Sequence, residues 1–275
     1  MADSNIDEIG PWSEVKLDII REYAQAYSQI LSAQKEPRLY HIYIDAFAGA
    51  GVHLSRATKE FVPGSPLNAL NVSPPFAEYH FIDIDQARVD SLQQVAQQRQ
   101  NVFVHEGDCN QVLLGKVFPR VQYKDYRRGF CWLDPYGLHL DWKVIYTAGQ
   151  MKSVEIFLNF PIMDMNMNVL KHDPESVPSE QAERMTRFWG DGSWKSAAYS
   201  TTGNLFGYEE KLDNETVTKA FRERLLGVAG FKHVSKPLAM RNSRGAVVYY
   251  LFFASPKPVA LRIVKDIFKK HEKNL

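Results

Sequence analysis

The residues of this chain best suited to chemistry are a glycine-containing turn and several acids that follow strand-like runs. The turn at 45–51 reads Asp-Ala-Phe-Ala-Gly-Ala-Gly and directly follows a β-rich run at 39–45. Its glycines let the backbone pass close to a ligand, because no Cβ stands in the way. Asp83 and Asp108 follow two later runs of strand type. Ligands of open α/β sheets bind at the carboxyl ends of the strands, so these residues are predicted to share one site.

The spacing of the turn argues against a nicotinamide dinucleotide as the ligand. Leu54 stands where that fingerprint wants a third glycine, and Asp83 follows Gly51 by 32 residues, whereas about 20 are expected. A ligand with a ribose and an adenine but no phosphates fits better, and S-adenosylmethionine is such a ligand. Asp83 could then accept both ribose hydroxyls and Asp108 the adenine amino group. Asp45 could meet the methionine ammonium through water or a backbone group.

The first predicted helix adds a lysine to this cofactor site. Lys16 lies near where such folds bring an N-terminal helix to the cofactor's carboxylate, although a solvated helix face also explains a lysine there. For each acid taken alone, a helix cap or a solvated loop is likewise an alternative. The predicted cofactor residues are Asp45, Phe47, Gly49, Gly51, Asp83, Asp108 and Lys16.

A second candidate site, for the methyl acceptor, follows the fourth predicted strand at 130–133. The chain there reads Asp134-Pro135-Tyr136-Gly, and proline removes a donor and leaves nearby carbonyls free to accept. Asp134 could accept a hydrogen bond from the amino group of a base and localise its lone pair toward the methyl donor. Tyr136 could stack on the ring, so that catalysis is largely positioning. We assign Asp134, Pro135 and Tyr136 to catalysis; an Asp-Pro turn with Tyr136 in the core is the structural alternative.

Three further residues are candidates for substrate binding. Arg127 and Arg128 belong to a basic patch that could track phosphates, or could simply be solvated. Asn159 lies near the end of the fifth predicted strand. The eight histidines show no metal-ligand spacing, so no metal site is predicted.

Strand-like runs alternate with helical periodicity along most of the chain, which predicts a parallel sheet covered on both faces. A helix capped by Ser13 is expected before Pro37, and another begins near Gly64. Strands are expected at 39–45, 79–83, 102–105, 130–133, 154–160, 231–240 and 246–255, and further helices at 86–98, 111–118, 214–228 and 259–270. The region 161–208 breaks this rhythm, and we interpret it as an insertion with short helices over the carboxyl edge of the sheet, within one domain spanning 1–275.

Composition excludes several classes of protein. With 45% apolar and 24% charged residues, the chain is neither disordered nor fibrous. A net charge of +1 argues against an indiscriminate nucleic-acid binder but leaves room for a local basic groove. Two cysteines cannot form an all-cysteine zinc site and suggest a reducing compartment. The polar start at 1–10, expected to be flexible, is no signal peptide, so a cytoplasmic protein is predicted.

Taken together, these motifs resemble those of the three-Cys-motif partner protein (TcmP) family, over most of the chain. The resemblance is carried by Trp12-Ser13 with Lys16, the runs 43–51, 81–85, 107–110, 134–137 and 250–255, Gly64-Ser65-Pro66 with Ala69-Leu70, and Asn159-Phe160. It implies a class I, Rossmann-like methyltransferase fold: a seven-stranded, mostly parallel sheet with helices on both faces and an antiparallel last hairpin. It also implies a partner protein that carries the three cysteines and is similar to radical-SAM-type proteins.

Two further resemblances concern the reaction. Positions 45, 47, 49 and 51 are similar to those of amino-methyltransferases acting on adenine, although a single proline precedes Tyr136 where those enzymes carry two. Asp-Pro-Tyr-Gly is similar to the motif of tRNA guanine-N2 methyltransferases. We therefore expect transfer from S-adenosylmethionine, with S-adenosylhomocysteine as product, to an exocyclic amino group of RNA or DNA. The alternatives are a non-catalytic scaffold for the cysteine-motif partner and a nicotinamide oxidoreductase.

Overall fold

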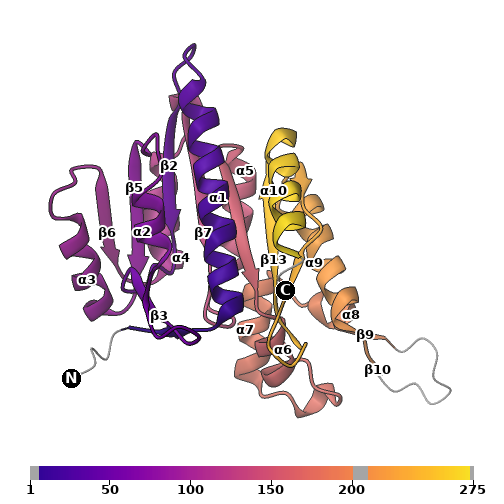
Figure 1. The fold of residues 1–275 in the computed structure, drawn as a ribbon. Helices are drawn as coiled ribbons and strands as arrows, with labels where there is room; N and C mark the ends of the chain where they lie inside the picture. Colours follow the sequence, from indigo (N-terminus) through magenta and orange to yellow (C-terminus); the bar gives the residue numbers. More distant parts are fainter. Residues whose placement is uncertain (1–5, 201–209, 273–275) are drawn as a thin grey trace.

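A central, mostly parallel sheet organises the computed structural model, which describes residues 6–200 and 210–272. Within these residues the sheet has eight strands in the order β11-β13-β8-β7-β2-β5-β6, with β12 also paired to β13 (Figure 1). The parallel strands are β2 (Tyr40–Asp45), β5 (Glu78–Asp83), β6 (Val102–Glu106), β7 (Arg127–Leu133) and β8 (Val154–Phe160). The antiparallel ones are β11 (His233–Val234), β12 (Leu238–Arg241) and β13 (Val247–Ser255).

The predicted mixed α/β fold is confirmed, but the sheet differs from the expected seven strands. The run at 231–240 forms two short strands, β11 and β12, which pair with different parts of β13. Pro237 lies between them and has no N–H to donate to the ladder, which accounts for the interruption.

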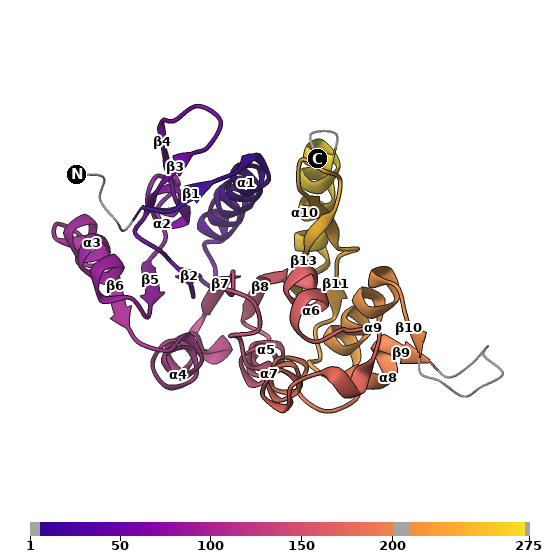
Figure 2. The same cartoon turned by 90° about the horizontal axis from the view of Figure 1, so that it is seen from below.

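Helices cover both faces of this sheet (Figure 2). One face carries α1 (Pro11–Ala33), α2 (Ser65–Leu70), α3 (Gln86–Ala96) and α10 (Pro258–His271). The other carries α4 (Cys109–Val112), a π-helical turn at Leu113–Val117, α5 (Trp142–Met151), α7 (Ser179–Trp189), α8 (Trp194–Ala198) and α9 (Asn214–Gly227). Side chains alternate between the two layers: Tyr43 packs with α1, whereas Ile42 and Ile44 face the α5 side.

The part of the 161–208 region that is described, 161–200, contains short helices. These include α6 (Ile162–Asn168), which follows β8 directly, and then α7 and α8; β9 (Tyr199–Ser200) pairs with β10 (Glu210–Lys211). Figure 1 shows α6 and α7 below the ends of the parallel strands. Residues 201–208 lie outside the described residues, and the assignment of an insertion within one domain stays a prediction.

The N-terminal segment differs from expectation. Residues 8 and 9 form β1 (Glu8–Ile9), which pairs with β3 (Val52–Ser55), and β3 pairs with β4 (Phe61–Pro63). The described residues before α1 are therefore part of a small sheet and not a flexible start. The expected cap was also wrong: Gly10 is the N-cap of α1 and Pro11 its first residue, so Ser13 lies inside the first turn.

Among the described residues, no helix is both long enough and apolar enough to cross a membrane.

Candidate functional site

Two adjoining cavities lie at the carboxyl edge of the sheet. The larger, of about 570 Å³, is lined by residues that include Lys16, Gly49, Asp134 and Asn159. The smaller, of about 410 Å³, is lined by Asp83, Asp108 and their neighbours. Phe47 and Tyr136 line both cavities. The two cavities therefore meet at these two aromatic side chains.

The glycine turn is fixed by backbone hydrogen bonds to both neighbouring strands. Ala46 N donates to Trp132 O (3.0 Å), and Ala48 N donates to Ile82 O (2.9 Å). Gly49 and Gly51 have φ values of +64° and +83°, which glycine adopts without the strain of a side chain. The turn thus places the Gly49 amide against the strand end that carries Asp83.

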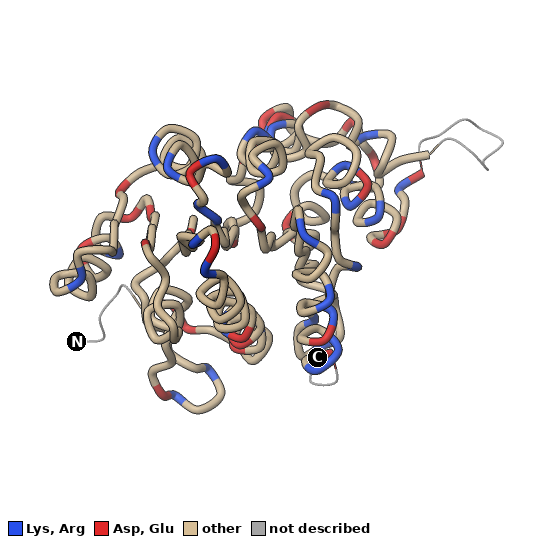
Figure 3. Tube along the Cα trace, turned by 90° about the horizontal axis from the view of Figure 1, so that it is seen from above, with Lys and Arg blue, Asp and Glu red and all other residues tan. Residues whose placement is uncertain are grey.

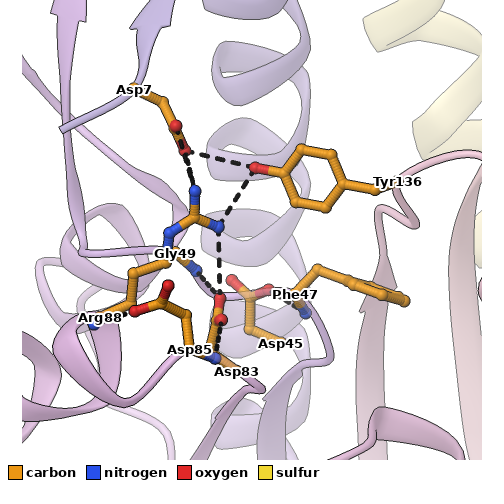
Figure 4. Close-up of polar contacts among 8 residues, drawn as sticks. All are labelled: Asp7, Asp45, Phe47, Gly49, Asp83, Asp85, Arg88 and Tyr136. Carbon is orange, nitrogen blue, oxygen red and sulfur yellow. Dashed lines mark hydrogen bonds and ion pairs between the residues drawn. The ribbon is translucent and has the colours of Figure 1, made fainter. Parts of the chain in front are cut away.

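Asp83 is held by backbone amides at the end of β5. Gly49 N donates to its Oδ2 (2.8 Å) and Asp85 N to its Oδ1 (2.9 Å), as Figure 4 shows. Its side chain is only 6% exposed, so the small open fraction faces the smaller cavity that it lines. Both oxygens keep a second acceptor position, because a carboxylate has about four lone-pair sites. Asp83 can therefore accept hydroxyl donors from a ligand there.

Asp108 lines the same cavity and also caps a helix. Its Oδ1 accepts a hydrogen bond from Gln111 N (3.0 Å) at the start of α4. The helix-cap alternative is therefore confirmed. The other carboxylate oxygen, Oδ2, lies 3.3 Å from Asn110 Nδ2 and can accept from a further donor.

Asp45 is buried and lines neither of these cavities. Phe47 N lies 3.4 Å from its Oδ1, whereas Oδ2 has no hydrogen-bond partner among the described residues. Burial raises the pKa of Asp45 to about 7. Asp45 and Gly51 are therefore placed to shape the turn, while Gly49 and Phe47 face the cavities.

Asp134 lies in a network with two of the other predicted residues. Lys16 Nζ donates to its Oδ2 (2.5 Å), and Asn159 Nδ2 donates to its Oδ1 (2.8 Å). Lys16 also lies over the rings of Trp132 (5.6 Å) and Tyr249 (5.2 Å). Lys16 therefore forms an ion pair with Asp134, a contact that the sequence did not predict.

Asn159 has one more polar atom to offer. Its Oδ1 is buried and has no hydrogen-bond partner among the described residues, although the side chain lines the larger cavity. An unpaired buried acceptor costs free energy unless a ligand or water supplies a donor. The cavity therefore has an acceptor beside Asp134 that suits an N–H group.

Tyr136 does not lie in the core, so the structural alternative for this residue was wrong. It is 61% exposed, and its ring lies at the junction of the two cavities, next to Pro135 in the larger one. The hydroxyl lies 3.3 Å from both Arg88 Nη1 and Asp7 Oδ2 (Figure 4).

Arg127 and Arg128 are not brought to either cavity. They begin β7, whereas Asp134 follows its other end, and a strand of seven residues spans about 20 Å. Arg127 pairs with Glu78 (2.5 Å), and the Arg128 guanidinium lies over the Tyr123 ring at 3.8 Å. Figure 3 views the molecule from above, on the side where the parallel strands begin.

Sequence reasoning missed further residues of the site, among them Asp7, His53, Arg88 and Asp164. Asp164 comes close to the backbone at Gly137: a Cβ on that residue would lie 2.8 Å from Asp164 Oδ2. Gly137 also has a φ of +56°. The glycine after Tyr136 was the one available signal that another side chain comes close at this turn. Among the described residues, no group of three or more His, Cys, Asp or Glu could hold a metal.

Comparisons with known proteins give the fold. No family model matches the sequence, and no curated protein does. Protein LPL1258 from Legionella pneumophila str. Philadelphia 1, of family DUF519, is similar in structure with a TM-score of 0.52 and 11% identity, over 92% of this chain and 90% of that one. A "putative methyltransferase" from Thermobifida fusca YX has a TM-score of 0.46 and 13% identity, over 90% and 80% of the two chains. The likeness to LPL1258 is one of fold alone.

Proposed function

We propose that this protein is an S-adenosylmethionine-dependent methyltransferase that acts on an exocyclic amino group of a nucleic-acid base. The observation that carries this proposal is the pair of adjoining cavities. One is lined by Asp83 and Asp108, the other by Asp134 and Asn159, and they meet at Phe47 and Tyr136. A cofactor site and an acceptor site must touch in this way for a group to pass between them.

The residues of the smaller cavity fit the adenosine part of this cofactor. Asp83 offers acceptor positions to the ribose hydroxyls, and Asp108 offers one to an amino group. The Gly49 amide has no Cβ beside it, so the chain beyond the ribose can pass into the larger cavity. When bound, the cofactor supplies a methyl group already activated on a sulfonium.

The larger cavity fits an amino group as acceptor. Such a group has two N–H donors, and Asp134 together with Asn159 Oδ1 presents acceptors to both. Hydrogen bonds of this kind localise the nitrogen lone pair, which the ring otherwise withdraws. Lys16 donates to Asp134 Oδ2 and holds the carboxylate in place. Met163 and Met167 offer the ring an apolar wall.

Methyl transfer from radiolabelled S-adenosylmethionine to tRNA and to DNA tests the proposal. Asp134→Ala should keep the affinity for S-adenosylhomocysteine within about threefold and lose at least about 100-fold in transfer rate, as expected for a lost positioning contact. Asp173→Ala, at an exposed turn that lines neither cavity, serves as the control. Unchanged turnover of Asp134→Ala would remove the acceptor assignment.

The Lys16–Asp134 ion pair favours a second candidate function. An acid already paired and hydrogen-bonded inside the chain can be purely structural, as in a non-catalytic scaffold. On its sequence motifs we infer membership of the TcmP family, so the partner of such a scaffold would be a cysteine-motif, radical-SAM-type protein. This function would be favoured if the protein co-purifies with that partner without any cofactor and shows no methyl transfer. The Asp83→Ala variant should then co-purify as well.

A further inference from the structure

Three residues from distant parts of the chain meet above the junction of the two cavities. Arg88, in α3, contacts both carboxylate oxygens of Asp7 through Nη2, at 3.1 and 3.0 Å. Its Nη1 lies 3.3 Å from Tyr136 Oη, which lies 3.3 Å from Asp7 Oδ2. Figure 4 shows these contacts closing a triangle. We refer to Asp7, Arg88 and Tyr136 as the junction cluster.

The junction cluster is more constrained than an ordinary surface ion pair. The Arg88 side chain is 20% exposed, and the guanidinium also lies 3.9 Å from Asp83 Oδ2, so it bridges two carboxylates. Leu54 N donates to Asp7 O (3.0 Å), which fixes the backbone of this segment beside β3. The Asp7 side chain is 40% exposed, but a guanidinium that joins several partners in a network is held more firmly than one in an isolated surface pair.

The position of the cluster matters because its members face different cavities. Asp7 lines the larger cavity and Arg88 the smaller, while Tyr136 lines both. A ligand that occupies only the smaller cavity lies beside Arg88. A ligand that extends into both cavities must pass between the cluster and the glycine turn.

We propose that Asp7 and Arg88 are positioning residues that hold the Tyr136 ring across the junction, over a single ligand that occupies both cavities. This inference rests on the proposed function, because the ligand that spans the junction is then the methyl donor or its product. A spanning ligand would contact the Tyr136 ring, so loosening the cluster should speed its release. The same contacts place Tyr136 where it can stack on an acceptor in the larger cavity, so the cofactor site and the acceptor site share one side chain.

Ligand dissociation tests this arrangement with two probes of different length. On the proposed function, S-adenosylhomocysteine is the ligand that occupies both cavities, whereas adenosine occupies the smaller one alone. The variants are Asp7→Asn and Arg88→Gln, which remove the ion pair, and Tyr136→Phe, which keeps the ring and loses the hydroxyl. Arg21→Gln, which breaks an exposed ion pair with Asp18 on α1, is the matched control. Thermal unfolding of each variant checks that it is folded.

Surface plasmon resonance on the intact chain should show dissociation of S-adenosylhomocysteine about tenfold faster in Asp7→Asn and Arg88→Gln, and less so in Tyr136→Phe. The dissociation constant for adenosine should stay within about twofold in Asp7→Asn, because Asp7 lines only the larger cavity, and the control should behave as wild type. Unchanged S-adenosylhomocysteine rates in the variants, or equal weakening of both ligands in Asp7→Asn, would overturn the positioning role. Failure of the wild type to bind either ligand would instead overturn the proposed cofactor site, and this inference with it.

Discussion

The orientation of Asp134 depends on the two side chains that donate hydrogen bonds to it. Its side chain is 23% exposed, and Lys16 Nζ donates to Oδ2 at 2.5 Å. Asn159 then fixes the second oxygen. The three side chains come from α1, the end of β7 and β8, so packing of the whole sheet sets their geometry.

Lys16→Met should lower the rate of the proposed methyl transfer by about tenfold or more, because the Asp134 carboxylate loses the donor that fixes its Oδ2. Lys16→Arg, which retains a charged donor, should recover part of that rate. Transfer from radiolabelled S-adenosylmethionine measures both variants. An unchanged rate in Lys16→Met would show that the ion pair has no part in positioning Asp134.

Gly137→Ala should destabilise the fold more than its backbone conformation alone explains. Gly137 and Gly245 both have positive φ, +56° and +78°, but a Cβ at Gly137 meets the Asp164 carboxylate at 2.8 Å, whereas nothing lies within 4 Å of one at Gly245. The control Gly245→Ala carries only the backbone cost, about 1 kcal/mol. Gly137→Ala should lose about 1–2 kcal/mol more in urea unfolding; equal losses would mean that Asp164 moves away freely.

At the scale of single residues, the sequence predicted the acids better than their partners. Asp83, Asp108 and Asp134 follow apolar strand runs, and parallel strands end at one edge, so their convergence could be predicted. Asp7 and Arg88 could not, because 81 positions separate them and the pairing depends on how β1 docks on β3. Arg127 and Arg128 illustrate the converse error, since they begin a strand whose other end carries Asp134.

At the scale of elements, a buried carboxyl joins α1 to the sheet. Glu155 in β8 accepts hydrogen bonds from Tyr23 of α1 and from Ser255 Oγ of β13 (2.8 Å to the latter). Burial raises its pKa from 4.5 to about 7. The folded state thus binds this proton more tightly than the unfolded chain does.

Glu155→Gln should flatten the pH dependence of stability. Because the folded pKa lies above the unfolded one, wild-type stability from this group is lost as pH rises from about 4.5 through about 7. Between pH 5 and 8 the free energy of unfolding of the wild type should fall by on the order of 2–3 kcal/mol more than that of the variant. His41 and His80, whose pKa values burial lowers to about 4, contribute equally to both proteins and cancel. Urea unfolding at the two pH values checks this, with the exposed Glu223→Gln as control; parallel curves would contradict the assignment.

The elements that could be predicted are those with long buried runs. All seven residues of β8 are buried and five of them are apolar, as expected of a strand in the interior of a mostly parallel sheet. The helix α5 was not predicted, because Val144, Ile145, Thr147 and Gly149 lower helix propensity. Gly149 is required by packing: a Cβ there would lie 2.1 Å from Ala229 O. The strands β1, β3 and β4 are too short to give a periodic signal.

At the scale of the whole molecule, the two faces of the sheet have separate cores and the site lies at their common edge. The core on the α1 side is rich in aromatic rings, with Tyr23, Phe130 and Phe157 in edge contacts of 5.1–5.8 Å. Figure 2, seen from below, looks onto the edge where the parallel strands end, with helices on either side. Such an edge brings chain segments far apart in sequence around one ligand.

Calorimetric titration of the purified protein with S-adenosylhomocysteine tests the proposed cofactor site. Wild type and the exposed α3 variant Asp90→Ala should bind with one site and equal affinity. Asp83→Ala removes the carboxylate that the Gly49 and Asp85 amides hold. It should bind at least about 30-fold more weakly, because the ligand loses two hydrogen bonds to a charged group. No saturable binding by the wild type, or equal affinity in Asp83→Ala, would contradict the proposed cofactor site.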